Sequence, residues 1–463
     1  MEFVTEYLPI FMFVTLALLL FSGYPVAFIV GGVGLAFAVI GHMLGAFKIQ
    51  QLSLIPLRIY GGTMESAVLV AIPMFTFMGT MLEKSGVARD LLQALQVLLR
   101  RVPGGLALSV TLMGTIMAAT TGIIGASVVM MTLMALPVML ERRYSVPLAT
   151  GTIAASGTLG ILIPPSIMLV IMSDLLSVPV GTVFIAAIVP GLLLAALYAI
   201  YIFVLCNLRP ELAPPLPDDI GPADRAGFWL MILRSFLPPI FLIVLVLGSI
   251  FLGWATPTEA SGIGAAGAVL LAAMNRQLHW ATFLDVCKRS ALTGAMLFGI
   301  FVGATAFAYV FRALGGEHLI VEFIQNSSVG PWSILFVLMA MIFLLGFFFD
   351  WIEITLIVLP IFAPIVGLLD FGGHVGEWDG IPKPIIIWFL ILAAVNLQTS
   401  FLTPPFGFAL FYLKGVAPPE VKIQQIYRGI IPFVALQLLG LVLCIGFPEL
   451  VLWLPSWALG GPS

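Results

Sequence analysis

Long apolar stretches, separated by short charged or proline-rich pieces, set the pattern of this chain. Most of them have the length of a membrane-spanning helix, about 20 residues, and exceed the roughly 10 residues of a barrel strand. A chain in lipid must also satisfy its backbone hydrogen bonds internally, which favours helices. We therefore expect an all-α polytopic membrane protein, with apolar segments at residues 7–22, 25–46, 66–82, 104–141, 146–177, 180–208, 227–253, 257–275, 291–313, 331–369, 384–416 and 428–458.

The composition agrees with this pattern, since 61% of the residues are hydrophobic and only 9% are charged. That balance indicates an integral membrane protein with almost no soluble core. The net charge of -3 and the lack of a basic run give no indication of nucleic-acid binding. Cysteines and histidines are dispersed, without the spacing of a metal site. The N-terminus lacks a basic n-region, so we expect a retained first helix rather than a cleaved signal peptide.

Two proline pairs interrupt the apolar segments, Pro164-Pro165 in the first half of the chain and Pro404-Pro405 in the second. A proline pair removes two backbone donors and clashes with the preceding turn, so a helix cannot run through it. In hydrocarbon the freed carbonyls need another partner. Paired breaks at matching places in two halves indicate the ion and substrate site of a secondary transporter.

Segments 104–141 and 331–369 are too long for one span and too short for two spans with a loop. Each is typical of a re-entrant hairpin, which enters and leaves the membrane on one side. The segments that carry the proline pairs, 146–177 and 384–416, are expected to be discontinuous helices. The last apolar segment, 428–458, is expected to be one long tilted helix or a helix with an interfacial tail.

Four shorter pieces mix charged residues with Leu, Ile or Val. This mixture predicts interfacial helices that lie in the plane of the membrane. The four pieces are residues 48–60, 87–101, 277–290 and 317–326.

A linker rich in proline and aspartate, residues 209–225, divides the chain almost in half. Residues 1–208 and 226–463 share one order of features. Each half has a small-residue helix after a proline, an amphipathic piece, a span, a second charged piece, a hairpin, a broken helix and a closing span with an early proline. We therefore expect two structural repeats joined by a cytoplasmic linker.

The charges predict opposite orientations for the two repeats. Four arginines flank the first hairpin, which should open to the cytoplasm, whereas polar and acidic residues flank the second, which should open to the periplasm. Lys48 and Arg58 fall on the outer side in this arrangement, against the usual charge bias. Two matching halves of opposite orientation form an inverted repeat.

Small polar side chains gather at the hairpin tips and around both breaks, where exposed carbonyls and hydroxyls can replace the water shell of a cation. The first half offers Ser127, Ser156, Thr158 and Ser166, and the second offers Asp350, Glu353, Thr355, Asn396, Gln398, Thr399, Ser400 and Thr403. Asp350 follows three phenylalanines in apolar sequence, where an ionisable group is a functional candidate.

Each of these candidates has a structural alternative. The hydroxyls can make ordinary helix–helix hydrogen bonds, which are common in membranes. Asp350 can make a structural hydrogen bond or salt bridge near the hairpin tip, and Glu353 can share its role. For Glu259 we favour a carboxylate at a helix N-terminus over a ligand.

Several stretches of the sequence resemble the large membrane subunit of tripartite ATP-independent periplasmic (TRAP) transporters. They are the run from Ser156 to Ser166 (SGTLGILIPPS), the run from Ala255 to Ala260 (ATPTEA), Asn396-Leu397 and Leu402-Thr403-Pro404-Pro405. The resemblance covers nearly the whole chain. It implies an elevator-type secondary transporter of the bacterial inner membrane, with Na+ as the coupling ion and no cofactor. It also implies a small organic acid substrate, a separate small four-helix membrane subunit and a periplasmic substrate-binding protein as partners.

The family's sodium sites lie where hairpin tips meet broken helices. By this resemblance the sodium and substrate region comprises Ser127, Ser156, Gly157, Thr158, Gly160 and Pro164 in the first half, and Asp350, Asn396, Ser400, Thr403 and Pro404 in the second. The second break departs from the usual pattern. Gln398-Thr399-Ser400 stands where an acid, an apolar residue and a glycine are common, Phe406 replaces a small aliphatic residue, and Trp351 and Glu353 are unusual neighbours of Asp350.

Two other functions are compatible with parts of the pattern. A self-sufficient anion carrier or exchanger of similar architecture would need no binding protein. An intramembrane enzyme would need a second catalytic acid or a metal motif beside Asp350, and the sequence contains neither a paired membrane aspartate nor HExxH.

Overall fold

The computed structural model describes residues 5–121, 124–216, 224–319, 322, 330–404 and 407–460. Throughout these ranges the chain is helical and contains no strand, as the sequence predicts. The α-helices are α2 (Leu8–Leu20), α3 (Val26–Met43), α4 (Leu54–Ile59), α5 (Ala71–Lys84), α6 (Val87–Leu98), α7 (Gly105–Thr121), α8 (Ile124–Glu141), α9 (Val146–Thr158), α10 (Ile167–Leu175), α11 (Val180–Leu208), α12 (Arg225–Phe251), α13 (Pro257–Met274), α14 (Trp280–Ala313), α16 (Pro331–Leu345), α17 (Trp351–Val366), α18 (Pro384–Ser400), α19 (Phe408–Val416), α20 (Ile423–Gly446) and α21 (Glu449–Leu459).

Six helices in the described ranges are long and apolar enough to cross a membrane: α3, α8, α11, α12, α14 and α20. A further pair, residues 49–64 and 68–84, passes the same test together but bends by 60° between its two parts. Shorter apolar helices fill the rest of the molecule. The chain is therefore a multi-pass membrane protein, built largely from helices that are interrupted rather than continuous.

The breaks between helices lie at the positions that the prolines and small residues of the sequence predict. Segment 104–141 forms the helix pair α7 and α8, and segment 331–369 forms the pair α16 and α17. The first proline pair separates α9 from α10, and the second break separates α18 from α19, although Pro405 lies outside the described residues. Re-entry of the two hairpins from opposite sides of a membrane stays a prediction.

One predicted boundary differs from the structure. Residues 277–290 do not form a separate interfacial helix, because α14 runs without a break from Trp280 to Ala313. No proline interrupts that stretch, and its charged turn is compatible with a helix, since Asp285 accepts a hydrogen bond from Arg289 one turn later at 2.9 Å. The last apolar segment divides into α20 and α21, so it is not one long helix, and an interfacial position of α21 stays a prediction. Most of segment 317–326 lies outside the described residues.

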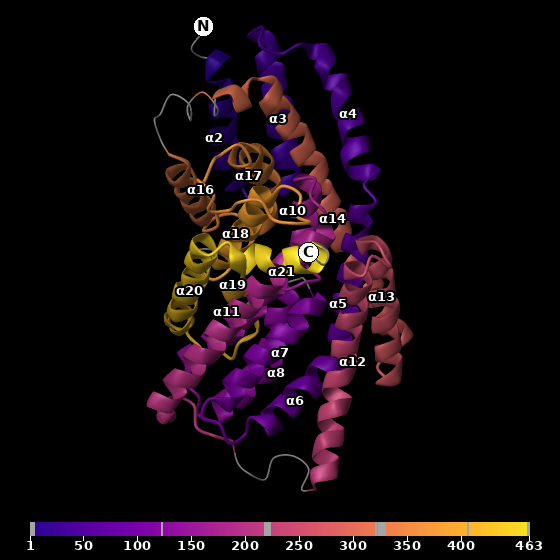
Figure 1. The fold of residues 1–463 in the computed structure, drawn as a ribbon, viewed down its shortest axis with the longest axis vertical. Coiled ribbons are helices and arrows are strands. Elements are labelled where there is room, and N and C mark those ends of the chain that lie inside the picture. Colours follow the sequence, from indigo (N-terminus) through magenta and orange to yellow (C-terminus); the bar gives the residue numbers. More distant parts are fainter. Residues whose placement is uncertain are drawn as a thin grey trace.

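The helices pack in two groups (Figure 1). The first group contains α2, α3, α4, α5, α12, α13 and α14, with α4, α12 and α13 at the right of the view. The second contains α7 to α11 and α16 to α21, with α16, α18 and α20 at the left and α21 lying across the view at mid-height. Helix α6 packs on both α7 and α12 and so lies between the groups. The groups also meet directly, because α5 packs on α7 and α10, and α14 packs on α17.

Helix pairs from the two halves recur in matching positions. Helix α3 packs on α14, and its counterpart in the second half, α13, packs on α5. Likewise α9 packs on α20, while α18 packs on α11. An inverted repeat requires this kind of reciprocal pairing. The division into two inverted repeats stays a prediction.

The described part of the linker closes the base of the first hairpin. The amide of Gly104, just before α7, donates to the carbonyl of Ala213 at 3.1 Å, and the amide of Ser145, just before α9, donates to Leu212 at 2.8 Å. Leu216 returns a hydrogen bond to the carbonyl of Arg100 at 3.0 Å. The start of the linker and the arginine-flanked base therefore lie together. Residues 217–223 of the linker are outside the described ranges.

Candidate functional site

The first break is a short irregular turn that supplies its own hydrogen bonds. Helix α9 ends at Thr158, one 3-10 turn follows to Ile161, and α10 begins after Ser166. Pro165 has no N–H for the carbonyl of Ile161, four residues earlier, and the hydroxyl of Ser166 donates to that carbonyl instead. The same Ser166 oxygen accepts from the amide of Leu169 at 3.4 Å and caps α10. Ser166 therefore has a structural role, and the carbonyl of Gly160 loses its helical donor to Pro164.

The three residues before this break face three different neighbours. The Oγ of Ser156 lies 3.4 Å from Oγ1 of Thr111 on α7. At Gly157 the neighbour is α8, since a Cβ there would lie only 2.4 Å from Cγ2 of Val128. The hydroxyl of Thr158 donates to its own helix at 2.8 Å and accepts from Nε2 of Gln437 on α20 at 3.4 Å.

Ser127 is buried on α8, one residue before the valine that touches Gly157. The structure thus brings the first hairpin against the broken helix, as the sequence predicts. It does not direct the hydroxyls of Ser156 and Thr158 to a single point. A cation at this break would be held mainly by backbone carbonyls near Gly160 and by whichever hydroxyls turn towards it.

The second break is packed beneath the second hairpin. Gly346, where α16 ends, lies so close to α18 that a Cβ there would be 2.4 Å from Cβ of Ser400. Nδ2 of Asn396 donates to the carbonyl of Met339 on α16 at 2.7 Å. Two of the five residues predicted for the second half of the sodium and substrate region, Asn396 and Ser400, therefore contact the first arm of the hairpin.

The hydroxyls around the second break serve their own helix. Thr399 donates to Asn396 at 2.6 Å, Ser400 to Leu397 at 2.5 Å, and Thr403 to Thr399 at 2.9 Å, all to backbone carbonyls. These bonds use the hydroxyl protons and leave oxygen lone pairs free to accept. These residues therefore make structural hydrogen bonds, although the bonds are to their own helix rather than between helices.

Unpartnered polar atoms concentrate in the same turn of α18. Oδ1 of Asn396 and both amide atoms of Gln398 are buried without a hydrogen-bond partner among the described residues. A buried polar group without a partner is costly, and such groups in native proteins usually meet water, an ion or a ligand. The sodium and substrate region implied by the family resemblance omits Gln398, although the sequence shows it as a departure from the family pattern.

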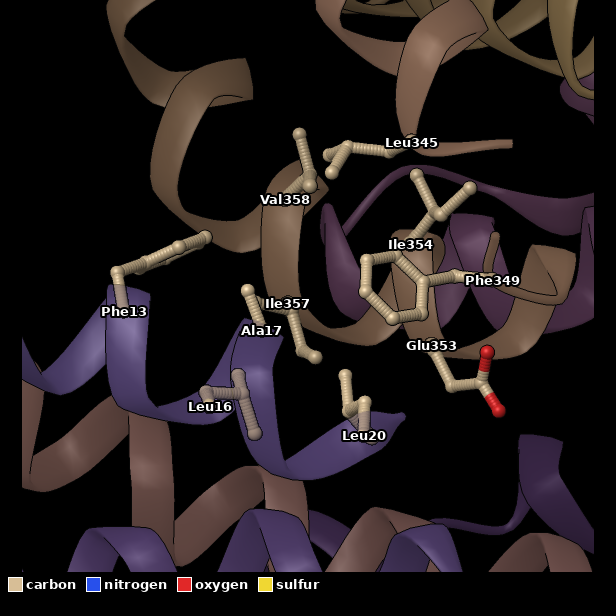
Figure 2. Close-up of a pocket in the computed structure, with 10 residues that line it drawn as sticks. All are labelled: Phe13, Leu16, Ala17, Leu20, Leu345, Phe349, Glu353, Ile354, Ile357 and Val358. Carbon is tan, nitrogen blue, oxygen red and sulfur yellow. The ribbon is translucent and has the colours of Figure 1, made fainter. Parts of the chain in front are cut away.

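Asp350 and Glu353 form a reciprocal cap at the start of α17. Oδ1 of Asp350 accepts from the amide of Trp351 at 2.7 Å, and the amide of Asp350 donates to Oε2 of Glu353 at 2.5 Å. Figure 2 shows Glu353 beside a small apolar cavity between α2 and α17, with its carboxylate turned away from the apolar side chains. The structural hydrogen bond considered for Asp350 is thus present, and Glu353 shares that role.

Glu259 also has the role predicted for it. Its carboxylate accepts from the amide of Thr256 at 2.7 Å, and the hydroxyl of Thr256 accepts from the amide of Glu259 at 3.3 Å. This is a capping box at the N-terminus of α13, and Glu259 is a helix-terminal carboxylate rather than a ligand. Thr355, by contrast, is buried on α17 with a hydroxyl that has no partner among the described residues.

Comparison with known proteins identifies the family. A sequence model described as "Tripartite ATP-independent periplasmic transporter, DctM component" matches residues 13–450. The C4-dicarboxylate TRAP transporter large permease protein DctM of Pseudomonas aeruginosa is 30% identical over 399 residues, which cover 85% of this chain and 88% of the relative. The sialic acid TRAP transporter large permease protein SiaM of Vibrio cholerae is 25% identical over 444 residues, covering 96% and 97%.

A solved structure is similar to the fold as a whole. The crystal structure of the YdaH transporter of Alcanivorax borkumensis, a transporter described as having an unusual topology, matches with a TM-score of 0.58 and 16% identity. The match covers 89% of this chain and 90% of that one. This likeness concerns the fold, whereas the family assignment rests on the sequence. The chain belongs to the DctM family, the large permease component of tripartite ATP-independent periplasmic transporters, and is a transporter subunit rather than an enzyme.

Proposed function

We propose that this subunit moves a small organic acid across the bacterial inner membrane together with Na+, after a periplasmic binding protein has delivered the acid. The observation that carries the proposal is the pair of buried side chains just before the second break, Asn396 and Gln398, whose polar atoms include three without a partner among the described residues. Their place beside a proline break is where a secondary transporter holds its ions.

These two side chains offer acceptors suited to a hard cation. Oδ1 of Asn396 and Oε1 of Gln398 are neutral oxygens on different faces of α18. Pro404 removes the helical donor of the Ser400 carbonyl, which the hydroxyl of Thr403 approaches only to 3.5 Å. Neutral oxygens can replace the hydration shell of Na+ without fixing a large negative charge in the membrane. We assign the sodium and substrate region to the predicted residues of both breaks and add Gln398 to them.

The substrate class is proposed from the relatives. Two of them are named for a C4-dicarboxylate and for sialic acid, both of which are acids. The word tripartite in the family description supports two further components, for which we propose a small four-helix membrane subunit and a soluble binding protein.

The movement is proposed to be of the elevator type. Support comes from the two packing groups, because the hairpins and broken helices belong to one group and the long helices α3, α12 and α14 belong to the other. In this arrangement the second group slides against the first and carries both breaks with it. The reciprocal pairing of helices from the two halves supports equivalent inward and outward positions.

The test is uptake by proteoliposomes that contain this chain and its small subunit. A mixture of C4-dicarboxylates, sialic acid and monocarboxylates is supplied with and without binding protein, under a sodium gradient or a matched potassium gradient. We expect accumulation only with binding protein and sodium together. Accumulation without binding protein would place the chain among self-sufficient carriers, and equal accumulation in the potassium gradient would remove sodium coupling.

A further inference from the structure

A cavity of about 440 Å³ lies where the two packing groups meet, away from both breaks. The first group supplies its wall from α14 and from the turn after α4, and the second supplies α17 and the end of α10. Two arginines line it, Arg58 after α4 begins and Arg312 near the end of α14. Cationic side chains are scarce in this chain, which has 19 lysines and arginines in 463 residues, so two in one cavity need an explanation.

Arg58 has no carboxylate partner in the described part of the chain. Its guanidinium lies over the ring of Tyr309 on α14, with Cζ 5.0 Å from the ring centroid. This cation–π contact positions the group without neutralising its charge. Arg58 also falls on the side of the membrane that the charge bias predicts to be poor in arginine, which is a cost unless the charge has a use.

Arg312 joins the two packing groups. Its Nε lies 2.7 Å from Oε1 of Glu317, and its Nη2 donates to the carbonyl of Pro360 on α17 at 3.3 Å. Pro364 has no N–H for that carbonyl, so the arginine supplies a donor that the helix lacks. Both partners are partly exposed, with 41% of the Arg312 side chain and 46% of the Glu317 side chain accessible, so a ligand carboxylate can compete with Glu317.

The remainder of the cavity suits the carbon skeleton of an organic acid. Leu175, Phe301 and Leu356 give it an apolar floor. Gly61 and Gly62 give it an open edge, since a Cβ at either position would have no neighbour within 4 Å. The hydroxyl of Thr305 is already bonded to the carbonyl of Phe301 at 2.8 Å, which leaves the two arginines as the charged donors of the cavity.

We propose that this cavity is an anion-docking site, in which Arg58 and Arg312 bind the carboxylate of the transported acid before it reaches the breaks. The identity of the ligand rests on the proposed function, whereas the positive charge of the cavity follows from its two arginines alone. Guanidinium groups bind carboxylates through paired hydrogen bonds, and this geometry gives Arg an advantage over Lys. Because the walls belong to both packing groups, movement of one group past the other would remake the cavity.

An anionic lipid headgroup shares the oxyanion chemistry and is the competing source. The cavity volume of about 440 Å³ is within the range of small-molecule sites and favours a small acid. The test therefore compares membranes with and without anionic lipid.

The first measurement is the reactivity of a cysteine in the cavity. Ala308→Cys, in a chain that carries Cys287→Ser, is purified with the small subunit and placed in phosphatidylcholine nanodiscs. Its labelling rate is measured with an anionic and a cationic methanethiosulfonate. We expect the anionic reagent to be favoured, and Arg58→Gln or Arg312→Gln to lower the rate ratio by about sevenfold each. A change of roughly one kT in local potential alters each rate by about threefold, and it acts in opposite directions on the two reagents.

Controls separate the site from general charge and from folding. Lys48→Gln removes a charge from the same predicted side without lining the cavity, and should leave the ratio unchanged. Arg312→Lys keeps the charge and should restore the ratio. A ratio insensitive to both Arg→Gln changes would overturn the proposal, and so would an equal effect of Lys48→Gln.

The second measurement is protection of the cysteine. Succinate and sialic acid are each compared with sodium chloride at equal ionic strength, and we expect at least one acid to slow labelling more than the salt does. Protection by phosphatidylglycerol alone, with no effect of either acid, would assign the cavity to lipid instead. Labelling needs neither a gradient nor the binding protein, so its outcome is independent of the uptake test of the proposed function.

Discussion

At the scale of single residues, one partly buried acid can have both a structural and a binding role. Asp350 caps α17 through its side chain and also lies at the tip of the second hairpin. The cap uses one carboxylate oxygen and leaves the other oxygen's lone pairs for a cation. Substitutions that separate shape from charge can distinguish these two contributions.

Asp350→Asn is expected to keep the cap, because Asn and Asp are similar as N-cap residues, while removing the charge. We expect its unfolding temperature in detergent to match the unmodified chain and its uptake to need more sodium. Asp350→Ala should lose the cap as well, at a cost of about 1 kcal/mol. If Asp350→Asn has an unchanged sodium dependence, the residue is a cap alone.

Replacing Gln398 by an apolar residue is expected to stabilise the protein, whereas replacing Asp350 by alanine is expected to destabilise it. Its amide is buried without partners among the described residues, so an apolar side chain of similar length removes an unpaired polar group. Gln398→Met should raise the stability of the protein by about 1–3 kcal/mol and reduce sodium-coupled uptake. Thermal unfolding and uptake of the same preparation check both parts. A variant that is less stable yet fully active would contradict the assignment of Gln398 to the site.

At the scale of elements, the sequence predicts what depends on local chemistry. Pro164 and Pro165 lack N–H groups wherever they stand, so the end of α9 could be predicted from them. Nothing local distinguishes a separate amphipathic helix at 277–290 from the first turns of α14, because the choice depends on packing against other helices. The isolation of the Gln398 amide is likewise a tertiary property that no spacing reveals.

The meeting of α9 and α20 depends on two glycines that face each other. A Cβ at Gly429 would lie 2.1 Å from the carbonyl oxygen of Pro147, and one at Gly151 would lie 2.2 Å from the carbonyl of Gly429. Gly429→Ala must push two backbones apart, and we expect it to destabilise the protein by about 1–3 kcal/mol or more. Gly415→Ala, with nothing within 4 Å, is the matched control. Detergent unfolding midpoints decide the comparison, and equal midpoints would mean that the helices do not approach this closely.

At the scale of the whole molecule, the elevator proposal requires the two packing groups to move apart where they now touch. One such contact is a hydrogen bond from the hydroxyl of Ser66, between α4 and α5, to Oδ1 of Asp174 at the end of α10, 2.9 Å long. The two residues belong to different groups and are 108 positions apart in sequence. A link at this point should hold the second group in one position.

Ser66→Cys with Asp174→Cys, joined by a short bifunctional thiol reagent, should therefore stop uptake, and cleavage of the link should restore it. The control is Ser85→Cys with Asn275→Cys, because Nδ2 of Asn275 donates to the carbonyl of Ser85 at 3.1 Å within the first group. A rigid group tolerates an internal link, so this pair should transport normally after treatment with the same reagent. If the linked Ser66–Asp174 pair transports at the full rate, the groups do not separate there, and the elevator movement is wrong. If both pairs stop transport, motion inside the first group is required, and the division of the helices into a fixed and a moving group fails.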